Sequence, residues 1–141
     1  MYSRLGTFFD TQLAALMRDD YAAFVSDYDF PLALQIEGEW VVYTSPLQLI
    51  EDLRTYRQWL LSIGVTILRC RINAVDVPRG DRFRVWTTVF HTDPQSATTT
   101  RSENLFFVRE KRGRFLIEMV QCTETETAEF TRSRWPAPQL T

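Results

Sequence analysis

The chain contains one histidine, His91, at the end of a run of strand-forming residues. An imidazole changes charge near neutral pH, so a histidine that faces an apolar cavity could move a proton in a dehydration, an isomerisation or a cyclisation. The same residue could instead be a polar group at the end of a sheet, hydrogen-bonded to Thr66 or to the adjoining loop. The residues alone leave both interpretations open.

A second candidate for acid–base chemistry is the segment Asp27-Tyr28-Asp29, where a helical pattern gives way to a strand pattern. A carboxylate that faces a cavity has its pKa raised by desolvation and can then act as a base. We predict that Asp29 orients His91 at the rim of such a cavity. Aspartate at this kind of junction also ends helices and begins strands, so a purely structural role is the alternative.

Three aromatic residues could line a pocket for a flat or polycyclic ligand, because they combine apolar area with a polar group. As core residues they would need no ligand, and the sequence does not separate the two roles. With inward-facing residues of the predicted sheet, the predicted ligand-binding set is Trp40, Tyr43, Tyr56, Thr87, Asn104 and Met119.

Other kinds of site have no support in the sequence. One histidine and two distant cysteines, Cys70 and Cys122, offer no cluster with the spacing of metal ligands, so we expect no metal. The two cysteines are interpreted as reduced core residues. Neither a nucleophile elbow nor a glycine-rich phosphate loop is present. The prediction is a site without metal or organic cofactor.

The size and composition set bounds on the architecture. The chain has 141 residues, of which 45% are hydrophobic and 24% charged, as suits one globular domain. We predict that this domain occupies residues 1–124 and that residues 125–141 form a tail that is flexible or ordered by a partner. Arginine supplies all basic residues except Lys111, a bias that GC-rich codons produce, so we expect a bacterial source.

The charge and hydropathy patterns argue against two classes of partner. The formal net charge is -2, whereas non-specific binding of nucleic acid needs a basic field. No stretch approaches the ~18 consecutive apolar residues of a membrane span, and the first residues lack the apolar run of a signal peptide. We therefore predict a cytoplasmic protein that binds neither nucleic acid nor membrane.

Helix signals predict helices over residues 4–18, 21–25 and 46–63. Asp19 or Asp20 can cap the second helix. For the third, Ser45 stands at the N-cap and Gln48 completes a capping-box pattern, while Gly64 ends the helix.

Alternating apolar residues and turn sequences predict the strands. Alternation over 32–36 and 40–43 predicts a short hairpin, with Pro31 at its start or edge. Three turns, at 78–80, 93–96 and 111–113, predict four long antiparallel strands between residues 65 and 123.

The turns also predict which side chains share a face. Pairing Val77 with Gly80, and Arg109 with Arg114, gives an inner face that is mostly apolar. Its predicted members are Thr66, Leu68, Cys70, Ile72, Ala74, Phe83, Val85, Thr87, Val89, His91, Ser102, Asn104, Phe106, Val108, Phe115, Ile117, Met119 and Gln121. A few polar groups in an apolar setting are typical of a ligand pocket.

The opposite, outer face mixes large apolar side chains with arginine and glutamate. Such a face is too apolar to suit full exposure, so we predict that two copies of the chain pair through it as a homodimer. The residues expected at this interface are Arg69, Arg71, Trp86, Leu105, Phe107 and Glu118.

Four segments carry a family resemblance: Asp29-Phe30-Pro31, Ser45-Pro46-Leu47, Gly64-Val65-Thr66, and the last strand, 113–120. In this order of elements, residues 4–124 resemble the NTF2-like superfamily and, within it, the SnoaL-like branch of cone-shaped α+β barrels. The resemblance implies an α+β, cystatin-like cone, in which three N-terminal helices and a short hairpin pack on a long curved four-strand antiparallel sheet.

The resemblance also implies a pocket between the sheet and the helices, and often a dimer. Enzymes of this superfamily typically use buried Asp, His or Tyr without a cofactor, and other members only bind ligands. Two hypotheses follow. The first is a protein that binds an apolar or polycyclic small molecule in its cavity, with a cofactor-free lyase or isomerase activity if His91 is catalytic. The second is a non-catalytic dimeric module for ligand sensing or assembly.

Overall fold

The computed structural model describes residues 1–125, and these form three helices and six strands. Most of the predicted tail, from residue 126 onward, lies outside the described residues. In chain order the elements are α1 (Tyr2–Met17), α2 (Tyr21–Val25), β1 (Tyr28–Ile36), β2 (Glu39–Tyr43), α3 (Pro46–Ser62), β3 (Ile67–Val75), β4 (Arg82–Asp93), β5 (Thr98–Lys111) and β6 (Arg114–Thr125).

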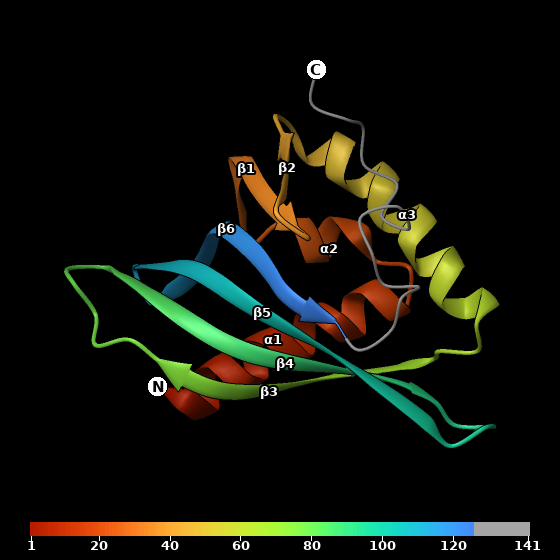
Figure 1. Cartoon of the computed structure of the whole chain (residues 1–141). Helices are drawn as coiled ribbons and strands as arrows, with labels where there is room; N and C mark the ends of the chain where they lie inside the picture. Colours follow the sequence, from red (N-terminus) through yellow and green to blue (C-terminus); the bar gives the residue numbers. More distant parts are fainter. Residues whose placement is uncertain (126–141) are drawn as a thin grey trace.

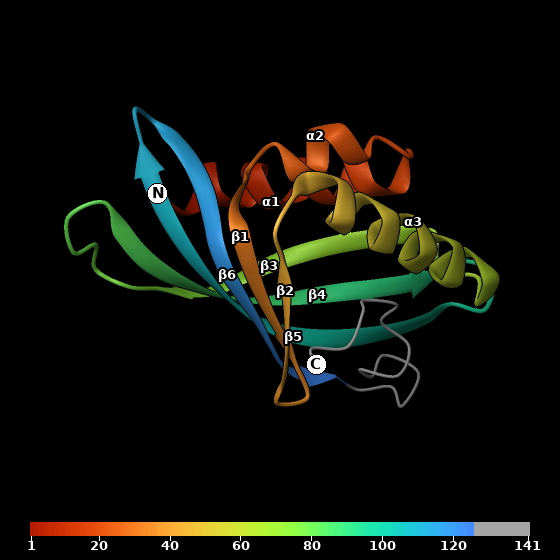
Figure 2. The same ribbon diagram turned by 90° about the horizontal axis from the view of Figure 1, so that it is seen from above.

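The strands form one six-stranded sheet in the order β2-β1-β6-β5-β4-β3. Figure 1 shows the long curved strands with α2 and α3 above them and α1 level with β3 and β4, and Figure 2 shows the same arrangement from above. The α+β class and the cone architecture are confirmed. The difference is that the hairpin extends the sheet instead of packing on it, because β1 runs parallel to β6 with Ala33 beside Met119.

The helix predictions hold with small changes at the ends. Asp20 caps α2 by accepting a hydrogen bond from the backbone N–H of Ala23 at 3.2 Å. The capping box predicted for α3 is wrong: the Ser45 side chain makes no capping bond, and Gln48 instead accepts from the backbone N–H of Thr44 at 2.8 Å. The extended backbone of Ser45 places Thr44, one residue earlier, within reach of the Gln48 side chain.

Gly64 ends the turn after α3 in a conformation that suits glycine. Its φ is +84°, and a Cβ at this position would lie 2.5 Å from Oδ2 of Asp93. The close approach brings the end of α3 against the β4–β5 turn. This contact fixes where β3 begins relative to β4.

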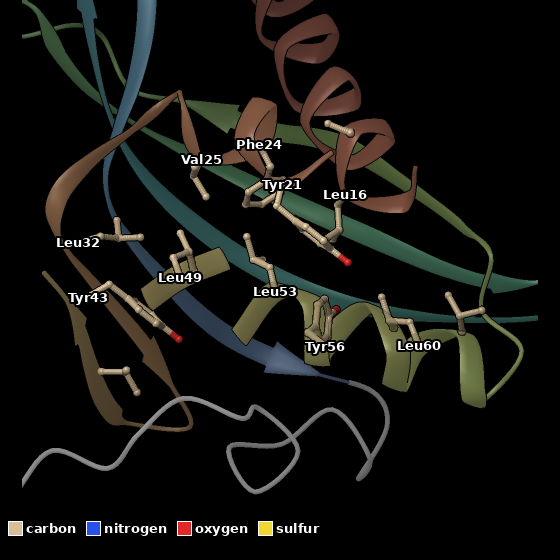
Figure 3. Packing of buried hydrophobic residues seen from close by; sticks show 13 residues of the cluster. Leu16, Tyr21, Phe24, Val25, Leu32, Tyr43, Leu49, Leu53, Tyr56 and Leu60 are labelled. Atoms are coloured by element: carbon tan, nitrogen blue, oxygen red, sulfur yellow. The ribbon is translucent and has the colours of Figure 1, made fainter. Parts of the chain in front are cut away.

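Two clusters of buried side chains make the core. One lies between α2, α3 and the β1–β2 hairpin; in Figure 3 the α3 residues Leu49, Leu53 and Tyr56 line one side of it. The other lies between α1 and the long strands. Tyr28 and Leu34 of β1 pack against both clusters, so β1 connects the two halves of the core.

The β3–β4 register differs from the prediction by two residues, which preserves the predicted faces over most of the pair. Leu68 pairs with His91, and the hairpin closes at Arg79 and Arg82. An irregularity between Ile72 and Ala74 then exchanges the faces to which the following side chains point. Val75 therefore packs against the core cluster in the place predicted for Ala74.

The β5–β6 pair contains a bulge at Glu118. Val108 pairs with Ile117, but Phe107 pairs with Met119, so residues beyond Glu118 are displaced by one position. A one-residue displacement moves each side chain to the opposite face. Val120 therefore lies in the core, and Met119 and Gln121, predicted on the inner face, lie on the outer one.

Candidate functional site

A pocket of about 140 Å³ lies between the inner face of the sheet, which the helices cover, and the helices themselves. Its wall is mainly apolar. The lining residues are Leu13, Phe24, Tyr28, Leu32, Leu34, Ile36, Leu49, Leu53, Tyr56, Leu68, Val89, His91, Ser102, Asn104, Phe106, Val120 and Cys122. The lining contains no Asp, Glu, Lys or Arg side chain.

His91 is a buried member of the pocket wall, with 5% of its surface exposed. Its Nδ1 lies 3.4 Å from the carbonyl oxygen of Thr100. A carbonyl can only accept, so this contact places the ring proton on Nδ1 and leaves a lone pair on Nε2. Burial lowers the pKa of His91 from the ordinary value of 6.5 to about 4, which keeps the ring neutral at pH 7.

Ser102 and Asn104 of β5 extend the polar part of the wall. They follow each other on the same face of the strand, and Nδ2 of Asn104 donates to Oγ of Ser102 at 3.3 Å. Ser102 pairs with Val89, two residues from His91 on the neighbouring strand. The three polar side chains therefore form one group on two adjacent strands. Ser102 was recognised as inward-facing from the sequence but was not included in the predicted site.

Two more polar residues lie in the pocket wall: Tyr56, which comes from α3, and Cys122, which comes from β6. Tyr56 is 8% exposed, and burial raises the pKa of its phenol well above 10. Cys122 pairs with Asn104, and this pairing brings β6 beside the polar group of β5. The sequence missed Cys122 because the bulge at Glu118, which turns it inward, has no clear sequence signal.

Four of the predicted ligand-binding residues are absent from the pocket wall. Tyr43 and Thr87 are each 1% exposed and belong to the core. The Tyr43 hydroxyl donates to Oδ2 of Asp52 at 2.7 Å, which joins β2 to α3. Trp40 is 38% exposed on β2, and Met119 is on the outer face.

Asp29 does not meet His91. Strand alternation directs Tyr28 into the core and Asp29 to the outer face, where Arg109 Nη2 lies 3.6 Å from Asp29 Oδ2. Asp27 likewise lies 3.4 Å from Nη2 of Arg114. The predicted pairing of Asp29 with His91 is therefore not formed in the structure.

The outer face carries the predicted interface residues, several of them in contacts within the chain. The guanidinium of Arg71 covers Phe90, that of Arg84 covers Trp86, and Glu118 accepts from Arg82 at 2.9 Å. Leu105 is only 9% exposed. Arginine thus shields part of the apolar surface on which the dimer prediction rests.

A larger hollow of about 610 Å³ also lies on the outer face, beside the β3–β4 loop. Two of the three arginines in its lining are in ion pairs: Arg82 with Glu118 at 2.9 Å and Arg84 with Asp76 at 2.7 Å. These ion pairs neutralise most of the charge in the lining, and the side chains of Arg82 and Arg84 are 60% and 48% exposed. The inner-face pocket, with its mainly apolar wall and few polar groups, is the better candidate for ligand binding.

Two features of the described part of the chain bear on other functions. Across residues 1–125, no three His, Cys, Asp or Glu side chains come together in a way that could hold a metal ion. In the same range, every helix is too short or too polar to cross a membrane.

No protein-family model and no curated protein matches the chain. Solved structures do match the fold of the chain. An NTF-2 like protein of unknown function from Shewanella oneidensis MR-1 has 17% identity and a TM-score of 0.59, covering 80% of this chain and 90% of that one. A ketosteroid isomerase-like protein from Erwinia carotovora atroseptica SCRI1043 has 18% identity and a TM-score of 0.57, covering 82% and 88%.

A third similar structure is a domain of unknown function with a cystatin-like fold from Nostoc punctiforme PCC 73102. It has 16% identity and a TM-score of 0.61, and the match covers 90% of this chain and 78% of that one. At these identities the likeness concerns the fold alone.

Proposed function

We propose that this chain, which has the NTF2-like fold, binds a small, uncharged and largely apolar molecule in the inner-face pocket. The observation that carries the proposal is the composition of the wall: apolar side chains surround one polar group formed by His91, Ser102 and Asn104. Apolar surface gives affinity in such a site, and a few placed polar groups orient the ligand. Membership of the SnoaL-like branch stays a prediction.

The ligand should be uncharged because the pocket has nothing to pair with a charge. Transferring an ion into an apolar cavity costs far more than a neutral hydroxyl or carbonyl costs, unless an opposite charge meets it. Carboxylates next to lining residues in sequence have other partners: Glu103 accepts from the Thr88 hydroxyl at 2.8 Å, and Asp27 and Asp29 are paired with arginines. A neutral hydroxyl, by contrast, can donate to the lone pair on Nε2 of His91.

The cavity volume indicates the size of the ligand. A cavity of about 150 Å³ holds a benzene molecule in another protein, and the pocket here measures about 140 Å³. A molecule with a single ring, or an aliphatic chain of similar size, matches this volume. The polycyclic ligand expected from the aromatic residues is larger than the pocket, partly because Trp40 and Tyr43 do not line it.

The geometry favours binding over the lyase or isomerase activity. A general base works best when its pKa is near the working pH, and that of His91 is about 4. Asp29, the residue predicted to orient it, is on the other face of the sheet. His91 is thus better suited to accept a hydrogen bond than to take a proton from carbon.

Two probes of matched shape test the proposal: 4-ethylphenol and ethylbenzene, titrated into the protein at pH 7 and followed by amide chemical shifts. We expect saturable binding of both, with shifts in β4, β5 and α3, and tighter binding of the phenol. In His91→Phe the affinity for 4-ethylphenol should fall about tenfold, the cost of roughly one hydrogen bond, and that for ethylbenzene should not change.

The matched control is Thr92→Val, at the next position of β4, where the Thr92 hydroxyl contacts that of Thr99 on the outer face. This variant should bind both probes as the unchanged protein does. Absence of saturable binding, or shifts confined to the outer face, would contradict the proposal.

A further inference from the structure

A glutamine interrupts the buried apolar stripe of α1. Gln12 is 4% exposed, and its neighbours along the stripe are Leu5, Phe9 and Leu16. The Nε2 of Gln12 is buried and has no hydrogen-bond partner among the described residues. A buried donor without an acceptor is costly, and methionine or leucine would fill this position without that cost. The amide therefore calls for a physical explanation.

The oxygen of the same amide meets a pocket residue. The Tyr28 hydroxyl donates to Oε1 of Gln12 at 3.5 Å, a long distance for such a bond. Tyr28 lines the pocket, as does Leu13, the residue next to Gln12. Burial raises the pKa of Tyr28 above its ordinary value of 10, so the hydroxyl keeps its proton. Tyr28 thus holds the oxygen end of the Gln12 amide, and Nε2 is the donor that has no partner.

Tyr28 and the polar group of His91 occupy different parts of the pocket. Tyr28 and Cys70 both pack against the core cluster between α1 and the long strands, and Cys70 pairs with Val89. His91 is two residues further along β4, which corresponds to about 7 Å of strand. Both residues line one cavity, at two separate positions along the sheet.

We infer that Gln12 and Tyr28 form a second recognition point, which binds a carbonyl oxygen of the ligand. The ligand class is then a small ring compound with a carbonyl at the Gln12–Tyr28 end and a hydroxyl at the His91 end. The oxygen accepts from Nε2 of Gln12, which satisfies that buried donor, while the Tyr28 hydroxyl stays on Oε1 and holds the amide in place. This inference rests on the proposed function, because it concerns the same pocket.

Three probes separate the two recognition points: 4-hydroxyacetophenone, which has both groups, 4-ethylphenol, which lacks the carbonyl, and acetophenone, which lacks the hydroxyl. We expect 4-hydroxyacetophenone to bind about five- to tenfold more tightly than 4-ethylphenol, as one added hydrogen bond allows. Gln12→Met should abolish this advantage and leave the affinity for 4-ethylphenol unchanged. Tyr28→Phe should act in the same direction.

The matched control is Gln35→Met, the same substitution on the outer face, where Gln35 accepts from Gln121 at 3.0 Å. It should preserve the preference for the ketone. Urea unfolding of each variant gives the second measurement: a purely structural role for Gln12 predicts a change in stability with equal affinity changes for all probes.

Each outcome is decisive. If 4-ethylphenol binds but the ketone has no advantage, or if Gln12→Met weakens all three probes alike, the inference is wrong and the proposed function stands. If none of the probes binds saturably, the proposed function fails, and the inference fails with it.

Discussion

Asp29 and His91 lie on opposite faces of one sheet. Asp29 contacts Arg109 on the outer face, at 3.6 Å, whereas the ring of His91 is enclosed in the inner-face pocket. No proton can pass directly between them. The arrangement leaves His91 with a backbone carbonyl, that of Thr100, as the contact at Nδ1, and a carbonyl orients the ring without adding charge to it.

The Asp29→Asn variant should therefore keep its pocket intact. We expect the affinity for 4-ethylphenol to change less than twofold. The free energy of unfolding should fall by less than about 1 kcal/mol, because the ion pair with Arg109 is half exposed. Titration of the probe and urea unfolding measure the two quantities. A loss of affinity as large as that in His91→Phe would place Asp29 in the site after all.

The stability of the protein should depend on pH through His91. Its pKa is about 4 in the folded chain, against 6.5 for an ordinary histidine, so the unfolded chain binds the proton more readily. Lowering the pH from about 6.5 to about 4 should thus remove up to about 3 kcal/mol of folding free energy. Urea unfolding at a series of pH values measures this slope.

Carboxylates also titrate toward the acid end of this range, so the test compares the protein with His91→Gln. The difference between the two stability curves should be flat above pH 7 and should change between pH 6.5 and 4. Because the chain has a single histidine, one imidazole NMR signal gives the folded pKa directly. A value near 6.5 would show that the ring is hydrated and would contradict the buried placement.

Tyr43→Phe should separate core packing from ligand binding. The change removes the hydroxyl that donates to Asp52 at 2.7 Å and keeps the buried ring. We expect the free energy of unfolding to fall by about 1–3 kcal/mol, the range for hydrogen bonds to charged acceptors. The affinity for 4-ethylphenol should stay the same, because Tyr43 does not line the pocket. If the variant is fully folded under the binding conditions but binds 4-ethylphenol more weakly, the placement of Tyr43 outside the pocket is wrong.

The proposal that two copies pair through the outer face predicts a mass of twice 16.6 kDa in sedimentation equilibrium. Phe107 is half-buried near the middle of that face, next to Met119 on the neighbouring strand. Phe107→Glu should shift the protein to monomer, because a charge would be buried at the apolar centre of the interface. Leu61→Glu, an exposed site on α3, is the control. A monomer at tens of micromolar would end the proposal.

The local structure could be predicted from the sequence where one residue type determines the backbone. Asp20 caps α2, and the glycines at 64 and 113 adopt the positive φ that ends a helix and turns a hairpin. The inward position of His91 was also predictable, although the register was off by two residues. An offset of two keeps each side chain on its face.

The predictions failed where long-range pairing decides the outcome. The bulge at Glu118 exchanges the faces of Met119 and Val120, and neither residue signals it, because both are apolar. Asp29 was predicted at a pocket rim because the strand was expected to begin after Pro31. It begins at Tyr28, and alternation from there sends Asp29 outward. The buried Gln12 within a helical apolar stripe could have been noticed from the sequence.

The parallel pairing of β1 with β6 has a consequence for how the chain reaches its native state. Gln35 and Gln121 hydrogen-bond across this pair although 86 residues separate them. During synthesis β1 leaves the ribosome long before β6 does, and until then only β2 can pair with its backbone. Non-local pairing of this kind slows folding. The cavity, which needs Leu34 of β1 and Val120 of β6, is therefore completed among the last features of the nascent protein.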